Sequence, residues 1–431
     1  MTSTLRITRR AADRLRSGHL WVYRSDIEHT DDALEPGALV TIADNRKIPL
    51  GTALYSTTSQ IAARLVSRTP ALTRQQYLAD LRSRIQTALQ LRRELAPLTP
   101  DNNAHRLIFA EADNLPGIIA DRYNDLVILQ LLSQGTAQDD VREVIVETLR
   151  AHLAPENQPL TIWERPDPRI RELEHLRAPA PGALFTNAPA EPPTTTTFTL
   201  NGLQFHYDAF AGQKTGAFLD QRLNYAAAAR HVLASGRTGR ALDICTYQGG
   251  FALHLARVCS EVTGLDQSRS ALEAAERNLN LNSGLRTTVD WVEADAFALL
   301  RAFDDALRSM THSLEVYARG PLPIELGAFD AIVLDPPAFA KSKRATEGAL
   351  RGYKELNLRA IRLLAPGGTL ITCSCSHHVS LADFTEIVGA AAADAGRRVQ
   401  LLETRAAAPD HPQVLTLPET GYLKCLICRV D

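Results

Sequence analysis

The chain has 431 residues, of which 45% are hydrophobic and 22% are charged. This length exceeds one ordinary core and suggests about three domains, and the composition excludes a disordered, collagen-like or fibrous protein. Taken over the whole chain, the net charge of −2 argues against a nucleic-acid partner.

The sequence also excludes several cellular settings. No apolar run reaches the roughly 18 residues of a membrane-spanning helix, and the N-terminus lacks the apolar region of a secretory signal. The six cysteines all lie at or after Cys245 and form no disulfide framework. We therefore expect a cytoplasmic protein without a membrane partner.

Positive charge is concentrated near the N-terminus. Residues 1–100 hold 15 Lys and Arg against 9 Asp and Glu, a net of +6, so the remainder carries −8. Phosphate contacts need local rather than global positive charge. This stretch is either a solvated basic surface or an RNA-binding face, with Arg9, Arg10 and Trp21 as the candidate contacts.

Two smaller modules are expected before residue 190. The first, residues 1–74, is β-rich, with short apolar runs at 40–43, 52–55 and 61–66. The second, residues 75–190, is α+β, with helices at 78–95 and 141–153 and strands at 117–121, 126–132 and 160–163. Residues 178–200 contain five prolines and four consecutive threonines, which predicts a linker or an extended crossing segment.

Residues 191–431 alternate between strand and helix patterns. This alternation predicts an α/β, doubly wound sheet. The expected strands are residues 241–245, 262–265, 289–292, 331–334 and 369–373, and a further strand-like run covers 422–430.

Acidic residues recur at the ends of the first four of these strands. Ligands of doubly wound sheets bind beyond the carboxyl ends of the strands. The acids are Asp243, Asp266, Asp295 and Asp335. Each alone is explained as a helix N-cap, but four in register favour a nucleotide-type ligand.

The turn after the first strand discriminates between cofactors. A dinucleotide fold requires Gly-x-Gly-x-x-Gly, whereas this turn offers only Gly249 and Gly250. It therefore favours S-adenosylmethionine over NAD. We expect Asp243 at the methionine ammonium, Asp266 at the ribose hydroxyls and Asp295 at the adenine amino group, with Tyr247 and Gly249 lining the cofactor.

Asp335 begins a stiff loop. Pro336 and Pro337 follow it directly and end the hydrogen-bonding ladder of the strand. The pattern predicts a catalytic loop beside the cofactor, with a plain turn as the alternative. Phe339 either stacks on a target base or packs under the loop.

Cysteines and histidines at the end of the fifth strand allow three interpretations. Cys373 and Cys375 are buried small hydrophobes, or they form a metal site with His377 and His378, or one of them is a nucleophilic thiolate. Cys375 lies nearer the carboxyl end of the strand, which favours it as the nucleophile. No metal is expected.

These motifs together resemble the bacterial class I large-subunit (23S) ribosomal RNA cytosine-C5 methyltransferase family that carries an N-terminal PUA domain. The motifs are LDICTYQGGF at 242–251, DPPAF at 335–339, RGYK at 351–354 and CSCS at 373–376. Further support comes from residues 111–117, 212–222, 410–412 and 418–424.

The resemblance implies a PUA-like domain at 1–74, a middle α+β domain at 75–190 and a Rossmann-like methyltransferase domain at 191–431, with a β-hairpin near 198–208. It implies that four further residues approach S-adenosylmethionine, namely Phe218, Asp220, Gln221 and Arg222. The implied partner is large-subunit ribosomal RNA, unassembled or precursor, and a homodimer is compatible with the sequence. The connection 301–328 is longer than the family leads us to expect.

The resemblance also implies a mechanism. Cys375 attacks C6 of cytosine, which activates C5 for methylation, and Asp335 steadies the ring. Lys214 and Lys354, two of only six lysines in the chain, lie inside the motifs and are candidate RNA contacts. The alternatives are N-methylation of guanine or adenine, an RNA-binding assembly factor without catalysis, and an NAD-linked oxidoreductase.

Overall fold

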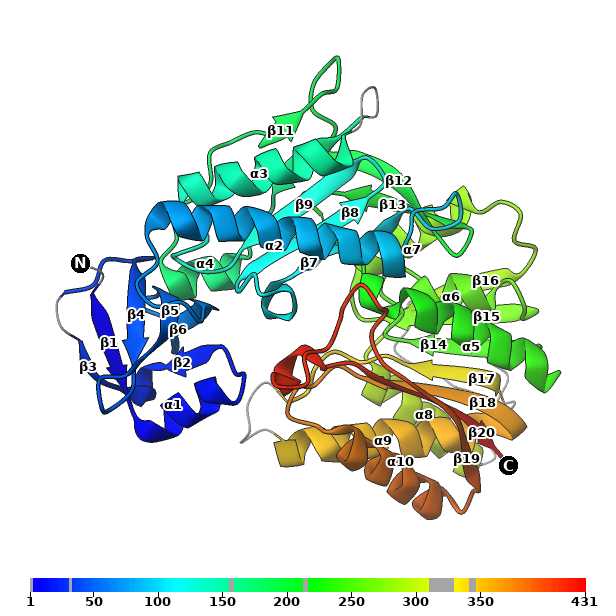
Figure 1. The fold of residues 1–431 in the computed structure, drawn as a ribbon. Helices are drawn as coiled ribbons and strands as arrows, with labels where there is room; N and C mark the ends of the chain where they lie inside the picture. The colour runs from blue at the N-terminus through cyan, green and yellow to red at the C-terminus, as the bar shows by residue number, and fades with distance from the viewer. Residues whose placement is uncertain (1–2, 31–32, 155–158, 212–215, 310–328, 341–345) are drawn as a thin grey trace. The chain divides into compact units, whose positions relative to one another are not determined.

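The computed structural model describes residues 3–30, 33–154, 159–211, 216–309, 329–340 and 346–431 (Figure 1). They divide into two compact units. The first comprises Met1–Thr199, Tyr207–Ala217 and Pro409–Thr420, and the second comprises Leu200–His206, Phe218–Ala408 and Gly421–Asp431. This division does not test the boundaries at residues 74 and 190, which stay a prediction.

The first unit begins with a six-stranded sheet of order β2-β6-β5-β4-β1-β3. The three predicted strands are present at the centre of this sheet as β4, β5 and β6. Three short strands, β1, β2 and β3, and one helix, α1, were not predicted. The bounds are β1 Thr4–Ile7, α1 Arg9–Arg16, β2 Trp21–Tyr23, β3 Ile27–Thr30, β4 Leu39–Ala43, β5 Pro49–Tyr55 and β6 Ile61–Ser67. Helix α1 begins at Thr8, whose hydroxyl accepts from the Ala11 amide, and buries Ala11, Ala12 and Leu15 in the sheet's core.

The same unit continues into a five-stranded sheet of order β11-β10-β9-β8-β7, covered by helices α2 and α3. The bounds are α2 Arg74–Leu95, β7 Ala104–Phe109, β8 Ile118–Tyr123, β9 Leu126–Leu131, α3 Asp139–Leu153, β10 Thr161–Glu164, α4 Pro168–Glu174 and β11 Phe185–Thr186. A capping box between Thr73 and Gln76 starts α2, and Leu81, Ile85 and Leu89 bury its apolar face.

Two details of this region differ from the expected pattern. The strands expected at 117–121 and 126–132 are joined by a shorter turn than their spacing indicates, because β8 runs through Tyr123 and Asn124, at φ 54°, takes the left-handed turn conformation. The segment 178–200, expected to be a linker or an extended crossing segment, contains strand β11 and all of β12 (Thr195–Leu200), which pairs with β13 (Leu203–Asp208). Alternation of threonine with Phe198 and Leu200 has period two, and this pattern outweighs the proline content of the preceding residues.

The second unit contains a seven-stranded sheet of order β16-β15-β14-β17-β18-β20-β19. All strands are parallel except β20, which lies antiparallel between β18 and β19. The bounds are β14 Arg240–Ile244, β15 Glu261–Asp266, β16 Thr288–Glu293, β17 Phe329–Leu334, β18 Leu364–Ser374, β19 Val399–Arg405 and β20 Lys424–Val430. The doubly wound α/β prediction and its five expected strands are therefore confirmed.

Helices cover both faces of this sheet (Figure 1). Residues of α8, α9 and α10 pack with the strands in one apolar core around Phe303, Tyr353 and Phe384. The bounds are α5 Arg222–Ser235, α6 Gly250–Leu255, α7 Arg269–Leu281, α8 Ala296–Ser309, α9 Thr346–Leu363 and α10 Leu381–Ala395. Helix α6 begins at Gly250, directly after the glycine turn. Much of the long 301–328 connection lies outside the described residues.

Within the described part of the chain, we find no helix that combines the length and the apolar character needed to cross a membrane.

The buried Phe198 provides a test of strand β12. Its ring lies 5.2 Å from that of Tyr123, which stacks on Tyr207 at 3.9 Å. We expect Phe198→Ala to lower the free energy of unfolding by about 3–5 kcal/mol, because it leaves a cavity in a fully buried site. Thr197→Ala on the exposed side of the same strand is the control, with an expected change within about 0.5 kcal/mol. Equal effects in urea unfolding would restore the linker interpretation.

Candidate functional site

The carboxyl ends of four parallel strands meet at one edge of the second sheet. Ile244 of β14 pairs with Leu265 of β15 and Leu334 of β17, and Leu334 pairs with Thr372 of β18. The amide of Asp335 donates to the Ile244 carbonyl at 3.2 Å. The residues that follow these strands are thereby placed side by side.

Asp243 is a buried acid at the centre of this edge. One carboxylate oxygen accepts from the Thr246 hydroxyl at 2.5 Å and from the Ala252 amide at 2.9 Å. The other oxygen is buried and has no hydrogen-bond partner among the residues that the structure describes. Burial raises the pKa of Asp243 to about 7. An unmatched acceptor in such a place is suited to a cationic donor from a ligand.

The loop after β14 is folded tightly. Cys245 and Tyr247 have positive φ angles of 63° and 52°, which are uncommon for residues with a side chain. Gly249 also has a positive φ, 82°, and an added Cβ would lie 3.1 Å from the ring of Trp291. The Tyr247 ring lies 4.8 Å from that of Phe218. Backbone atoms of this compact loop and the rings of Tyr247 and Phe218 therefore lie along the carboxyl ends of the strands.

Asp266 and Asp295, at the ends of β15 and β16, each accept hydrogen bonds from backbone amides. Asp266 accepts from the amides of Tyr247 and Ser268 at 3.0 and 2.9 Å. Asp295 is exposed and accepts from the Ala298 amide at 2.8 Å, as a helix N-cap does. Each carboxylate keeps further lone pairs for a ligand, so capping and ligand binding are compatible.

Cys375 lies beside the proline loop. Its thiol is half-buried and approaches the Pro336 carbonyl oxygen at 3.9 Å. Pro336 is buried, Pro337 is exposed and Asp335 is half-buried. Cys373 is fully buried opposite Cys425 in the β18–β20 register, which matches a packing role.

A polar network that the sequence did not reveal holds the backbone around Cys375. The Tyr353 hydroxyl lies 3.0 Å from the hydroxyls of both Ser374 and Ser376, and Ser376 also accepts from the Ala340 amide. The Lys424 ammonium donates to the carbonyls of Ser376 and Tyr422, both at 2.7 Å. Burial lowers the pKa of Lys424 to about 8, while the negative charge of Cys375 acts in the opposite direction.

The four residues expected near the cofactor around the start of α5 differ in their surroundings. Asp220 accepts from the Tyr422 hydroxyl at 2.5 Å, and Phe218 faces Tyr247. Gln221 and Arg222 are more deeply buried, with 2% and 4% of their surface exposed. Phe218 is therefore the one of the four that is partly exposed, since Asp220 is also buried.

The structure does not gather all predicted RNA contacts at this edge. Lys354 pairs with Asp394 of α10 at 2.8 Å, and Phe339 packs against Tyr353 with ring centroids 4.8 Å apart. Lys214 lies outside the described residues.

In the first unit, Arg9 is exposed near Asp13, at 3.8 Å, and Arg10 is exposed. The Trp21 indole donates to Glu111 at 2.9 Å. Many arginines of the basic stretch have carboxylate partners, which reduces its free positive charge. These pairs are Arg14–Asp26, Arg16–Asp44, Arg64–Glu174, Arg74–Asp140, Arg82–Glu147 and Arg92–Asp113.

Comparison with known families gives two matches. Residues 5–68 match the PUA-like domain, and residues 158–429 match the S-adenosylmethionine-dependent methyltransferase family. The second match covers more than half of the chain and fits the unpartnered oxygen of Asp243, since S-adenosylmethionine carries an ammonium group. The alternative that the chain is an NAD-linked oxidoreductase is therefore wrong.

Relatives match over nearly the whole length. "Ribosomal RNA large subunit methyltransferase I" of Cronobacter sakazakii and that of Escherichia coli are each 35% identical over 416 residues, covering 96% of this chain and 95% of the relative. Two solved structures align with this chain over 100% of its length and 100% of their own. One, assigned as a methyltransferase and complexed with SAH, has a TM-score of 0.75 and 19% identity. The other, from Streptococcus mutans and assigned as a SAM-dependent methyltransferase, has 0.74 and 18%, so both support the fold alone.

Proposed function

Since the chain belongs to the S-adenosylmethionine-dependent methyltransferase family that includes ribosomal RNA large subunit methyltransferase I, we propose that it forms 5-methylcytosine in large-subunit ribosomal RNA. The substrate is unassembled or precursor RNA. The observation that carries the choice of base is the half-buried thiol of Cys375, which lies at the carboxyl end of β18 beside the Asp335 loop. Methylation of a ring nitrogen or an exocyclic amine needs no such thiol.

The acids at the strand edge are proposed to hold the cofactor. Asp243 pairs with its ammonium through the oxygen that has no other partner. Asp266 accepts from the ribose hydroxyls and Asp295 from the adenine amino group, with Tyr247, Gly249 and Phe218 along its length. Asp335 borders the same place, and Asp220 fixes Tyr422. When bound, S-adenosylmethionine supplies an electrophilic methyl group on a sulfonium.

Cys375 is proposed to activate the target base. Its thiolate attacks C6, a C6–S bond forms, and the electron pair of the C5–C6 double bond becomes available at C5 for the methyl group. A base then takes the C5 proton, the double bond re-forms and the C6–S bond breaks. Asp335 donates or accepts at N3 or the exocyclic amine as charge develops on the ring. The base must leave its stack before either group can reach it.

Lys424 is proposed to favour the reactive ionised form of Cys375. Its ammonium is fixed by two carbonyls, one of them on the residue after Cys375. The charge of Cys375 interacts with this ammonium, and a buried positive charge stabilises a nearby thiolate more strongly than it does in water.

The first test removes the nucleophile. We expect Cys375→Ala to lower methyl transfer by at least about 10³-fold, because no other group activates C5. Cys373→Ala is the matched control two residues away and should retain transfer. Tritium transfer from S-adenosylmethionine to RNA that lacks the modification, followed by nucleoside analysis, measures both. Normal transfer by Cys375→Ala, or a methylated guanine or adenine as product, contradicts the mechanism.

A second test uses the pH dependence of cofactor binding. The protonated Asp243 cannot pair with an ammonium, so the Kd of S-adenosylhomocysteine should rise about tenfold per pH unit below about pH 7. Asp243→Asn should bind weakly with a flat profile, while Asp290→Asn, an exposed control on β16, should follow the native curve. Calorimetric titration between about pH 5.5 and 8 checks this expectation. A native curve without this slope contradicts the role of Asp243.

Stability of the ligand-free protein has the opposite dependence on pH. The folded-state pKa of Asp243, about 7, lies above its ordinary value of 3.8, so the folded protein binds the extra proton between these values. Stability should therefore fall as pH rises from about 4 to about 7, and Asp243→Asn should remove this part of the loss.

A third test examines Lys424. We expect Lys424→Met to lower kcat about 10–100-fold with little change in KM, and to move the pH–rate profile to higher pH. Lys424→Arg keeps the charge in a different shape and should restore the profile in part. A structural role alone would lower the rate of Lys424→Met without moving its pH profile, and that result contradicts the electrostatic role.

A further inference from the structure

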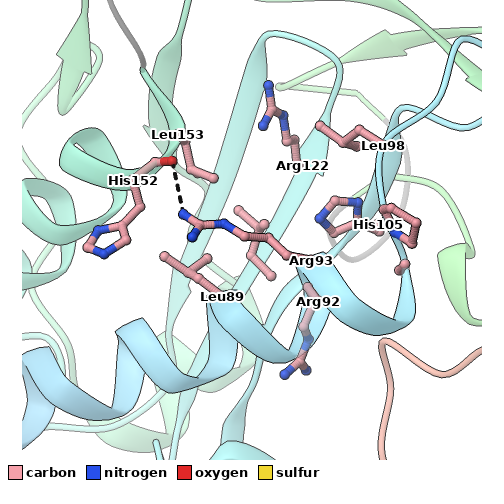
Figure 2. Close-up of a pocket in the computed structure, with 11 residues that line it drawn as sticks. Leu89, Arg92, Arg93, Leu98, His105, Arg122, His152 and Leu153 are labelled. Atoms are coloured by element: carbon pink, nitrogen blue, oxygen red, sulfur yellow. Dashed lines mark hydrogen bonds between the residues drawn. The ribbon is translucent and has the colours of Figure 1, made fainter.

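A pocket of about 270 Å³ lies within the first unit, whereas Cys375 belongs to the second. Helices α2 and α3 and strands β7 and β8 enclose it (Figure 2). Its apolar lining comes from Leu89, Leu98, Leu107 and Leu153. Leu98 is 42% exposed although it is a large apolar residue, so it offers a face for a ligand.

Cationic and aromatic side chains lie around this apolar lining. Arg93, Arg122, His105 and His152 line the pocket, and none of its lining residues is acidic. Figure 2 shows the side chain of Arg93 reaching toward the His152 carbonyl, whereas Arg92 points to the other side of α2. Arg92 is saturated there by Asp113 at 2.6 Å and by the Asp410 carbonyl.

The two remaining arginines keep donors for a ligand. Arg93 makes one long hydrogen bond, 3.5 Å, to the His152 carbonyl, and Arg122 donates through Nε to the Asn124 carbonyl at 2.8 Å. Among the described residues, neither guanidinium has a carboxylate within 4 Å. Burial lowers the pKa of Arg122, and the more distant Asp125 acts in the opposite direction. A desolvated cation without an ion-pair partner favours binding of an anion.

We propose that this pocket binds a nucleotide, with its phosphate at Arg93 and Arg122 and its base against the leucines and the His105 ring. The combination distinguishes this ligand class from simpler ones. Inorganic anions gain nothing from four leucines, and an apolar ligand gains nothing from two arginines. A guanidinium fork binds phosphate oxygens in pairs, and aromatic and apolar side chains stack on bases of any sequence.

The nucleotide belongs to a single-stranded segment of the RNA substrate or is a free mononucleotide. The first source rests on the proposed function, because it makes the pocket a second contact for the RNA. The second source is independent of methyl transfer. Both require the same two guanidinium groups, so one pair of variants tests them together.

The experiment compares two double variants of the full chain. Arg93→Gln with Arg122→Gln removes the two proposed phosphate contacts, on α2 and β8. Arg82→Gln with Arg150→Gln removes two exposed charges from α2 and α3, outside the pocket. Net charge changes equally in both. Binding of a labelled single-stranded RNA is measured by fluorescence anisotropy over a range of salt, and binding of adenosine 5′-monophosphate by calorimetry.

We expect the pocket variant to bind RNA at least about tenfold more weakly, with a salt dependence reduced by about 0.7 per lost phosphate contact. The control should resemble the native chain. Arg122→Lys retains the charge but loses the fork, and we expect an intermediate loss that separates phosphate recognition from misfolding. Adenosine 5′-monophosphate bound by the native chain and lost in the pocket variant identifies a free nucleotide as a ligand.

The outcomes separate this proposal from the proposed function. If the native chain methylates RNA, and both double variants bind RNA and adenosine 5′-monophosphate like the native chain, the pocket proposal is overturned and the function stands. If the native chain transfers no methyl group to RNA, but the pocket variant alone loses adenosine 5′-monophosphate, the function fails and the nucleotide site stands.

Discussion

The hydrogen-bonded register of four parallel strands determines where the groups of the proposed reaction lie. Ile244 stands between Leu265 and Leu334, and Leu334 stands beside Thr372. Parallel neighbours in register end together, so residues far apart in the sequence meet at one edge. A shift of one residue in β17 would turn its side chains to the opposite faces and withdraw the proline loop from Cys375.

This edge also concentrates groups whose burial is unfavourable in isolation. Asp243 keeps one oxygen without a partner, and the Lys424 ammonium is held in a buried site by two carbonyls. Both groups have pKa values moved toward neutrality by burial. Perturbed groups of this kind cluster at functional sites, because binding or catalysis compensates for the unfavourable environment. The surrounding network of Tyr353 and its two serines gives Cys375 a fixed backbone without contributing a charge.

The sequence predicted the features that depend on local pattern, and missed those that depend on distant contacts. Alternation of strand and helix located Asp243, Asp266, Asp295 and Asp335 at the strand ends. The hydroxyl network joining Tyr353 to Ser374 and Ser376 connects a helix to a strand end, and no spacing in the chain signals it.

Charge counting had the same weakness. A net of +6 in the first 100 residues suggested a phosphate-binding face. The fold pairs many of those arginines with carboxylates, such as Arg92 with Asp113, and leaves Arg93 at a pocket beside Arg122, which lies beyond that stretch.

The proposed reaction depends on a covalent bond between Cys375 and C6 of cytosine. Large-subunit RNA containing 5-fluorocytosine tests it most directly, because fluorine at C5 cannot leave as a proton and the protein–RNA bond is retained. Peptide mass spectrometry should find the RNA on Cys375, and no covalent complex, or attachment elsewhere, would contradict the account.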